Sequence, residues 1–552
     1  MVRVSWGQVR GVVASAAILL LPALSAQGAN TSYKVQQLNP TGSTAAFAVA
    51  LNKANAVVGN YTDSSGVVHG FKFATNKYTT LNFPMANKFT RASGINDSNL
   101  IVGDFLGKDN FYHGFTLSSG KYTQYDIALG TASTSIFGVN NAGDFVGATG
   151  SGGTNEGFVN IGGTVTEFYG SGTDNTFALA INNSNEVVGQ FIDSSGNSHC
   201  FERASTGTIT EIAYPGALQT SCAGINDSGV ITGWYENSSD QFYAFEDNAG
   251  VFTSLDFISA GGINNTGSFV GYYLGPGDQD YGYVASPHTI KSISSITVPK
   301  AQSTSILGVN NSGAMVGEYT NSTGATHGLL LSGGKSTNID DPNGLTGSTF
   351  CVNINSSGQI VGYYSTASSS FQGYLYSAGT FTDITPTGAT ESDVEGINDS
   401  GVMTGWYLDS SGIEHGFTFD GTTYTTIDAP GATASLGWGI NATGELTIDW
   451  VDAKGFTHGS LYNSGTFTSI DVPGATQTTA HSINKSGNVV FTWFDYYGND
   501  HGAVLEGGVY YIFDEPSGTS TRADGINDSN LIVGRFLQTG STTVFDGFKA
   551  MN

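Results

Sequence analysis

Charged residues are scarce in this chain, and basic residues are the scarcest of them. Only 12% of the 552 residues are charged, with 19 Lys and Arg against 45 Asp and Glu. Binding a nucleic acid requires clustered Lys and Arg, so a nucleic acid is not an expected partner. A basic partner or metal ions would suit the net charge better, but the acidic residues are dispersed, which favours solubility as their role. We therefore predict no metal site and no cofactor.

Long hydrophobic runs are absent after the first thirty residues. Arg3 and Arg10 accompany an apolar run at 11–24, and small residues follow at 25–29. This pattern predicts a secretory signal peptide over residues 1–29. No later stretch reaches the roughly 20 apolar residues that a membrane-spanning helix needs. We expect an exported monomer, extracellular or periplasmic, with no membrane span.

Cysteine is nearly absent, and three residues in a chain of this length are too few for a disulfide framework. Cys222 and Cys351 occupy one position of the repeat described below, where other copies have Ala, so small buried side chains are expected there. An oxidising compartment would also allow a bridge between Cys200 and Cys222.

Patterns of long amphipathic helices are missing too, whereas 77 glycines suit many short strands and tight turns. One motif recurs along the chain: a small residue, an aliphatic residue, Asn, a polar pair, Gly or Asn, two aliphatics, Gly, a variable residue and an aromatic. Its first aliphatic residue marks twelve copies, at Leu51, Ile95, Val139, Ile181, Ile225, Ile263, Val309, Ile354, Ile397, Ile440, Ile483 and Ile526. A period of about 43 residues indicates a solenoid or a propeller.

Each copy divides into four strand-length pieces, which is the size of a propeller blade. The last copy stops after its third strand, while residues 33–40 look like an isolated fourth strand. In the favoured arrangement, residues 33–40 complete repeat six and residues 290–299 complete repeat twelve, which gives two consecutive six-bladed propellers over 30–286 and 287–552. One twelve-bladed ring or a β-solenoid is the alternative. Known propellers typically have four to eight blades, which favours two rings.

Two recurrent polar columns are interpreted as scaffold. Asp97, Asp227, Asp399 and Asp528 resemble calcium ligands, but other copies have Asn at this position, which a turn tolerates and a charge-dependent cation site does not. Seven of nine histidines fall in one column and are expected to form hydrogen bonds between strands: His69, His113, His199, His327, His415, His458 and His501.

The motifs resemble bacterial extracellular repeat proteins of the HAF type. The residues that carry the resemblance are Gly396 to Gly405, His415 to Phe417 and Pro430 to Ala432, with the other copies as variants. The resemblance spans nearly the whole mature chain. It implies export and a β-repeat fold, and it implies no activity.

Departures from the repeat mark candidate sites, because a fold alone implies no function. The residue two positions before each marker is expected to line the central channel. In the first six copies it is mostly a core residue, whereas copies nine to twelve have Glu395, Trp438, His481 and Asp524 there. Asp393 and Arg522 lie two residues before the first and last of these. Because side chains alternate along a strand, we expect these six groups to meet near one channel mouth.

Other departures extend this prediction. Ile448 and Phe491 replace a repeat Gly, and a column of Trp234, Tyr272, Tyr363 and Trp406 would supply a stacking surface for sugar rings. In the alternative, Arg522 pairs with nearby carboxylates between blades and His481 is a satisfied buried group. The predicted ligand site comprises Asp393, Glu395, Trp438, His481, Arg522, Asp524, Trp234 and Trp406.

Three functions remain open at this point. The leading interpretation is a secreted binding or interaction module for a polysaccharide or a surface protein. The second is a hydrolase or lyase acting on an extracellular polymer, with Glu395, His481 and Asp524 as acid/base candidates. The third is a purely structural surface protein. Carboxylates across an open pocket would favour the enzyme, and ion pairing inside a closed channel would favour structure.

Overall fold

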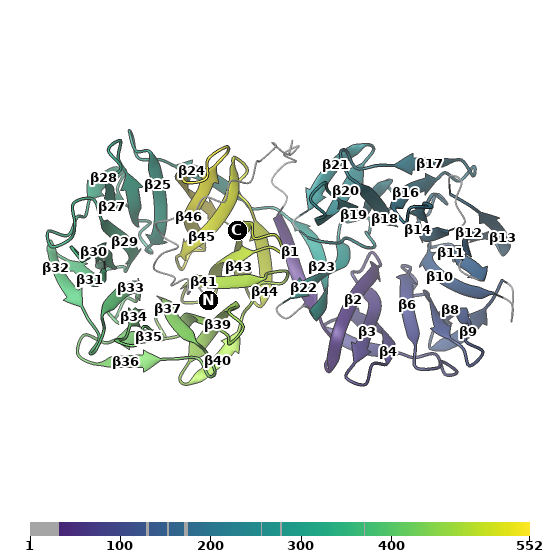
Figure 1. Cartoon of the computed structure of the whole chain (residues 1–552), viewed down its shortest axis with the longest axis horizontal. Coiled ribbons are helices and arrows are strands. Elements are labelled where there is room, and N and C mark those ends of the chain that lie inside the picture. Colours follow the sequence, from purple (N-terminus) through teal and green to yellow (C-terminus); the bar gives the residue numbers. More distant parts are fainter. Residues whose placement is uncertain are drawn as a thin grey trace.

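The computed structural model describes residues 32–127, 132–151, 154–170, 175–255, 257–275, 279–368 and 370–551, so the predicted signal peptide at 1–29 lies outside the described residues. The described residues form strands and turns and no helix. Their blades are arranged in two rings that lie side by side (Figure 1). The predicted all-β propeller fold is confirmed.

Blades one to five of the first ring are four-stranded antiparallel sheets whose strands follow one another in sequence. Their bounds are β2 (Ser43–Leu51), β3 (Val57–Asp63), β4 (Val68–Ala74), β5 (Lys77–Leu81); β6 (Thr90–Ile95), β7 (Ile101–Leu106), β8 (Tyr112–Ser118), β9 (Lys121–Tyr125); β10 (Ser133–Val139), β11 (Phe145–Ser151), β12 (Thr154–Ile161), β13 (Thr164–Phe168); β14 (Thr176–Ile181), β15 (Val187–Ile192), β16 (Ser198–Arg203), β17 (Ile209–Ile212); β18 (Gln219–Ile225), β19 (Val230–Glu236), β20 (Phe242–Asn248) and β21 (Val251–Leu255).

Blades seven to eleven of the second ring repeat this order. Their bounds are β25 (Ser303–Val309), β26 (Met315–Thr320), β27 (Thr326–Ser332), β28 (Lys335–Asn338); β29 (Thr349–Ile354), β30 (Ile360–Ser365), β31 (Phe371–Ser377), β32 (Thr380–Ile384); β33 (Glu391–Ile397), β34 (Met403–Leu408), β35 (Glu414–Phe419), β36 (Tyr424–Ile427); β37 (Ala434–Ile440), β38 (Leu446–Val451), β39 (Thr457–Asn463), β40 (Thr466–Ser469); β41 (Gln477–Ile483), β42 (Val489–Phe494), β43 (Asp500–Glu506) and β44 (Val509–Phe513).

The last blade of each ring is completed by a strand from elsewhere in the chain. In blade six, β1 (Ser32–Leu38) pairs with β23 (Gln279–His288), next to β22 (Phe269–Gly275). In blade twelve, β24 (Ser292–Ile296) pairs with β47 (Phe545–Met551), next to β46 (Leu531–Gln538) and β45 (Gly518–Ile526). Both predicted closures are confirmed, and each covers a strand edge that would otherwise be exposed.

A closed circle of asparagine side chains runs around each ring. The Asn after every marker residue accepts two backbone N–H groups of its own turn and donates its Nδ2 to the backbone oxygen of the corresponding Asn in the next blade. In the first ring these inter-blade bonds are 2.9–3.4 Å long, and the last runs from Asn264 back to Asn52. In the second ring they are 3.0–3.4 Å long, and Asn527 returns to Asn310. Two separate circles of six contradict both the twelve-bladed ring and the solenoid.

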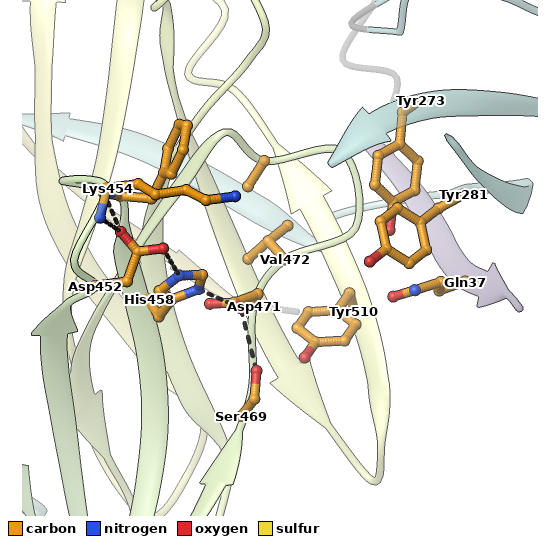
Figure 2. Close-up of a pocket in the computed structure, with 12 residues that line it drawn as sticks. Gln37, Tyr273, Tyr281, Asp452, Lys454, His458, Ser469, Asp471, Val472 and Tyr510 are labelled. Carbon is orange, nitrogen blue, oxygen red and sulfur yellow. Dashed lines mark hydrogen bonds and ion pairs between the residues drawn. The ribbon is translucent and has the colours of Figure 1, made fainter. Parts of the chain in front are cut away.

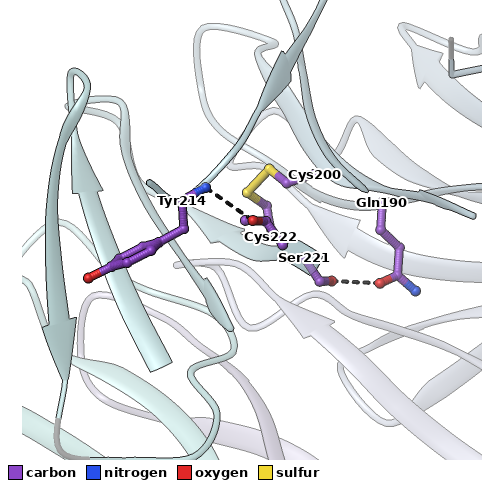
Figure 3. The surroundings of a disulfide bond; sticks show 6 residues. Gln190, Cys200, Tyr214, Ser221 and Cys222 are labelled. Atoms are coloured by element: carbon purple, nitrogen blue, oxygen red, sulfur yellow. Dashed lines mark hydrogen bonds between the residues drawn. A yellow bond between two sulfur atoms is a disulfide. The ribbon is translucent and has the colours of Figure 1, made fainter. Parts of the chain in front are cut away.

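Adjacent blades pack through a glycine on the third strand. An added Cβ at Gly70 would lie 3.2 Å from the Ala92 Cβ of the next blade, and one at Gly459 would lie 3.3 Å from that of Ala480. Between blades four and five this pair is Cys200 and Cys222, which form a disulfide (Figure 3). The predicted possibility of a bridge is therefore realised, whereas Cys351 is a buried free thiol whose pKa is raised by burial to about 12.

A second bridge is expected from one substitution. Gly328 occupies the Cys200 position opposite Cys351, and an added Cβ there would lie 2.7 Å from the Cys351 Sγ. The added Cβ would also overlap the Ile339 backbone oxygen, so the strand must shift to accept it. We predict that Gly328→Cys forms a disulfide with Cys351 and that this strain offsets part of the roughly 3 kcal/mol that such a bridge contributes. Thiol titration of the denatured, oxidised protein should fall from one thiol per chain to none. Gly459→Cys, which faces Ala480, is the control and should give two thiols; two thiols in Gly328→Cys would contradict the prediction.

The departures at Ile448 and Phe491 are exchanges of large and small side chains. In most blades the aromatic residue of the third strand lies over a second-strand Gly, as Phe71 lies over Gly59. Ile448 is instead paired with Ser460, and Phe491 with Ala503. Both large residues are fully buried. These departures therefore conserve core volume and carry no sign of a ligand site.

We expect this exchange to be reversible at Phe491. Phe491→Gly alone should lower the stability by about 3–5 kcal/mol because it leaves a cavity. Adding Ala503→Phe should restore much of that loss by rebuilding the arrangement of the other blades. Thermal midpoints of the two single variants and the double variant measure the coupling. A double variant no more stable than Phe491→Gly would show that the two positions do not compensate.

The two rings share one sheet and one core. β1 also pairs with β44 of blade eleven, which joins both rings in a seven-stranded sheet (Figure 1). Beside this sheet, the ring centroid of Tyr497 of the second ring lies 4.7 Å from that of Tyr243 of the first. The Tyr497 hydroxyl donates a hydrogen bond to the Phe242 backbone oxygen at 2.7 Å. A buried apolar cluster extends from Tyr33 and Phe257 to Val472 and Phe491. The contact between the rings is therefore extensive and largely apolar.

Candidate functional site: the pocket between the two rings

Blades five and six depart from the histidine column where the rings meet. Tyr243 and Tyr281 replace the His, and each stacks on a tyrosine of the preceding strand, Tyr235 or Tyr273. Across the junction, the blade-eleven turn reads Asp-Tyr-Tyr-Gly at 495–498, where three other copies read Asp-Ser-Ser-Gly. Aromatic substitutions in both rings therefore mark the junction in the sequence.

A pocket of about 480 Å³ lies at this junction. Figure 2 shows Tyr273, Tyr281 and Gln37 of the first ring facing a polar wall of the second ring, with Tyr510 of β44 between them. Burial raises the pKa of Tyr273 and of Tyr510, so both hydroxyls are neutral donors at ordinary pH. Gln37 is exposed, and the Tyr281 hydroxyl donates to Gln279 Oε1 at 3.0 Å. This wall offers apolar ring faces with polar edges.

The opposite wall is a histidine held between two carboxylates. His458 Nδ1 lies 3.0 Å from Asp471 Oδ2, and its Nε2 lies 3.7 Å from Asp452 Oδ2. The hydrogen bond with Asp471 raises the pKa of His458 despite partial burial. Burial opposes ionisation of Asp452, but the N–H groups of Phe456 and Lys454 outweigh it and lower its pKa. With the Lys454 ammonium on the same wall, positive and negative charges nearly balance.

The remaining histidines of the column make equivalent bridges. Each Nδ1 bonds a side chain in or just after the fourth strand, as His113 does with Asp126 at 2.8 Å and His199 with Glu211 at 2.8 Å. The predicted scaffold role is thus confirmed. Asp97, Asp227, Asp399 and Asp528 likewise accept backbone N–H groups from the neighbouring blade, as turn residues do. Among the described residues, no three His, Cys, Asp or Glu side chains gather as a metal site would require.

The predicted second-ring residues lie on the innermost strands, mostly buried. Asp393, Glu395 and Asp524 are 1%, 2% and 7% exposed. The Trp438 and His481 rings lie 4.9 Å apart, edge to face, and His481 Nε2 is 3.0 Å from Thr492 Oγ1. Ligand binding by these residues stays a prediction.

The two arginines of this region pair with different carboxylates. Arg535 contacts Asp524 at 3.6 Å and Glu318 at 3.9 Å. Arg522 instead bonds Asp500 of the preceding blade, which matches the structural alternative for this residue. The structure therefore joins Trp438 to His481, Asp524 to Arg535, and Arg522 to Asp500 across two blades.

The strands that carry the six predicted groups each contain a bulge. The strand register shifts at Glu395, His481 and Asp524, and also between Gly437 and Ile440 around Trp438. A bulge inserts one extra residue and interrupts the alternation of side chains. The same register shift occurs in the first ring, where Arg91 and Ser93 line one cavity, so the meeting of the six groups stays a prediction.

The predicted tryptophan column divides between the rings. Tyr363 and Trp406 of the second ring are buried, at 2% and 5% exposure. Trp234 and Tyr272 of the first ring line a central cavity of about 390 Å³. The innermost residues expected as core in that ring, among them Val49, Phe137, Leu179 and Ala223, line the same cavity.

Comparisons with known proteins give a fold likeness only. No protein-family model and no curated protein matches the chain. Among solved structures, the chain is similar to the six-bladed fucose-recognising lectin of Aleuria aurantia, with 11% identity over 54% of this chain and 95% of that chain and a TM-score of 0.26. It is also similar to the BP39L lectin of Burkholderia pseudomallei, with 10% identity over 60% of this chain and 94% of that chain and a TM-score of 0.26. Sequence identities and TM-scores this low do not indicate a ligand.

Sequence reasoning did not identify the junction pocket. Its tyrosines, Gln37 and Lys454 come from repeats far apart in the chain. The bridge at His458 has the same sequence pattern as the bridges of the other column histidines, so it does not stand out. The tyrosines in the histidine column and the Asp-Tyr-Tyr-Gly turn were the available signals. Nowhere in the described residues does a helix offer the length and hydrophobicity that crossing a bilayer requires.

The histidine bridges predict a stability maximum at mildly acidic pH. The raised pKa values of His113, His199 and His458 contribute stability that is complete below about pH 6.5 and is lost as the pH rises through the folded values. The lowered pKa values of the Asp partners act oppositely, with stability lost as the pH falls below about 4. The thermal midpoint should therefore be highest between about pH 4 and 6.5.

The matched variant is His458→Gln, because blade eight carries Gln372 in this column. Its thermal midpoint should fall less than that of the wild type between pH 6 and 8. Parallel curves for the two proteins would show that the His458 bridge contributes nothing to the pH dependence.

Proposed function

We propose that this protein is a secreted binding module for a neutral polysaccharide, with the pocket between the two rings as its binding site. The observation that carries the proposal is the facing of the partly exposed Tyr281 and Tyr510 rings, backed by buried Tyr273, with carboxylate, ammonium, amide and hydroxyl groups in one cavity of about 480 Å³. A pyranose ring has an apolar C–H face and a rim of hydroxyl groups. Tyrosine rings suit the face, and charged acceptors form strong hydrogen bonds with the rim.

The charge of the pocket favours a neutral polymer. The raised pKa of His458 favours its charged form, in which His458 and Lys454 offset Asp452 and Asp471, so neither an anionic nor a cationic chain gains from the net charge. Three of the four carboxylate oxygens already have hydrogen-bond partners in the scaffold, which fixes the orientation of both groups. A ligand hydroxyl would use their remaining lone pairs and Asp452 Oδ2. A protein partner needs a broad interface of roughly 800 Å² on each side, and a concave pocket suits a polymer segment better.

The hydrolase alternative is less well supported. General acid/base residues must reach the substrate, and Glu395 and Asp524 are 2% and 7% exposed. Export of the protein, and its relation to proteins of the HAF type, are part of the same proposal. Export depends on residues 1–29, which lie outside the described residues.

Two neighbouring glutamines give a matched test. Gln37 lines the pocket, whereas Gln36, the preceding residue of β1, is equally exposed and does not. Affinity electrophoresis through gels containing glucans, xylans, mannans or galactans should show retardation of the wild type by at least one polymer. Gln37→Ala should weaken that binding roughly 3–10-fold, the value of one lost hydrogen bond.

Lys454→Ala should act in the same way, with Lys335→Ala on β28 as its control, since Lys335 is also exposed and lies outside the pocket. Retardation that is equal in Gln37→Ala, Lys454→Ala and the two controls would place binding elsewhere. No retardation by any of the polymers would refute the proposed function.

A further inference from the structure

The central cavity of the first ring has a graded lining. Nearest the asparagine circle it is aliphatic, with the six marker residues Leu51, Ile95, Val139, Ile181, Ile225 and Ile263. The bulge residues form the next tier, where Ser93, Ala223 and Gly261 are small and leave space. Phe47, Asn60, Arg91, Trp234 and Tyr272 form the third tier. The cavity thus passes from a wholly apolar floor to an aromatic and polar rim.

The rim is aromatic on one side. Trp234 and Tyr272 come from adjacent blades, and the Tyr272 ring meets Phe47 edge to face at 5.1 Å. Trp234 is half-buried and makes an edge-to-face contact with Phe242 at 5.4 Å. Three aromatic side chains around one opening fit a flat ring better than a flexible chain, because aromatic pairs gain from offset or edge contacts.

The polar side of the rim carries no net charge. Arg91 bonds fully buried Asp104 through two parallel hydrogen bonds of 2.9 and 2.6 Å, which neutralises its charge. Asn60 Oδ1 accepts the Ala92 N–H at 2.8 Å, so its amide NH₂ is the group it offers a ligand. Ser93 adds a hydroxyl. With the Trp234 indole N–H and the Tyr272 hydroxyl, the polar groups lie toward the rim, and the aliphatic floor below them leaves the hydroxyls of a sugar without partners.

The other ring shows that the same backbone accepts large side chains at the bulge. There Trp438 and His481 occupy the positions of Leu179 and Ala223. The open cavity of the first ring therefore results from its small residues and is no necessary consequence of six blades. Its volume of about 390 Å³ lies within the range of small-molecule pockets.

From this lining we propose that the first ring binds a small neutral aromatic alcohol, of one or two fused rings, in its central cavity. The ring system lies against Trp234, Tyr272 and Phe47, and the hydroxyl group lies toward Asn60 and Arg91. This site is distinct from the polysaccharide pocket and does not depend on it.

Isothermal titration calorimetry with 2-naphthol at pH 6 tests the proposal on the full chain. The wild type should bind one equivalent, and 2-naphthoate and 1-decanol should bind at least tenfold more weakly, because one is charged and the other is flexible. Equal binding of naphthoate or decanol would overturn the assigned ligand class. Absence of any 2-naphthol binding up to about 1 mM would overturn the site.

Filling the cavity provides the matched variants. Ala223→Leu, the residue that blade four carries at this position, and Ala223→Trp should each weaken 2-naphthol binding at least tenfold, whereas Ala223→Ser should leave it unchanged. Two filling variants are used because the larger one can disturb the fold, which its thermal midpoint reports. Unchanged affinity in a folded filling variant would place binding outside the cavity.

The junction variant separates this proposal from the polysaccharide one. Gln37→Ala should bind 2-naphthol as the wild type does, and Ala223→Leu should keep any polysaccharide binding. A loss of 2-naphthol binding in Gln37→Ala would overturn the assignment of the ligand to the first ring.

Discussion

The asparagine circle is the interaction on which both rings depend. Each of these twelve side chains is 3–7% exposed, and each satisfies its own turn with Oδ1 and the next blade with Nδ2. A buried polar side chain must find partners for both ends of its amide, and the acceptor common to all twelve is the backbone oxygen of the neighbouring Asn. Asp would lack the donor and Ser the reach. The repeat of one residue thus imposes the same turn on every blade, and the circle closes after six.

Close packing between neighbouring blades depends on small side chains at their contacts. Glycine on the third strand lets the next blade approach closely, and where Cys200 replaces this glycine it forms a disulfide with Cys222 of the next blade. Where Ile448 and Phe491 replace the glycine of the second strand, a smaller residue on the third strand compensates for their volume. Such compensation explains why a broken motif is an ambiguous sign of function. At the junction of the rings the departures differ, because Tyr243, Tyr281 and Tyr497 replace polar residues without a matching change within their own blades.

Much of the fold could be predicted from the sequence. The period, the four strands per copy and the unpaired strands at 33–40 and 290–299 predict two rings and their closures, and the pairings of β1 and β24 confirm both closures. The site could not be predicted in the same way. The residues around Glu395 stand out in sequence, but Asp393 and Glu395 are deeply buried in the structure. The junction pocket combines Gln37 with Lys454, more than four hundred positions apart in the chain.

By itself the sequence determined the local structure, because turn chemistry, strand alternation and the Asn position are properties of a few consecutive residues and recur in each copy. It also determined that the copies differ in what they place near the channel. Only the tertiary structure decided which differences matter, since β1 pairs with β44 as well as with β23 and brings the two rings into one sheet. Cavities form between surfaces that the chain brings together, so their lining depends on the arrangement of whole rings, which no single repeat encodes.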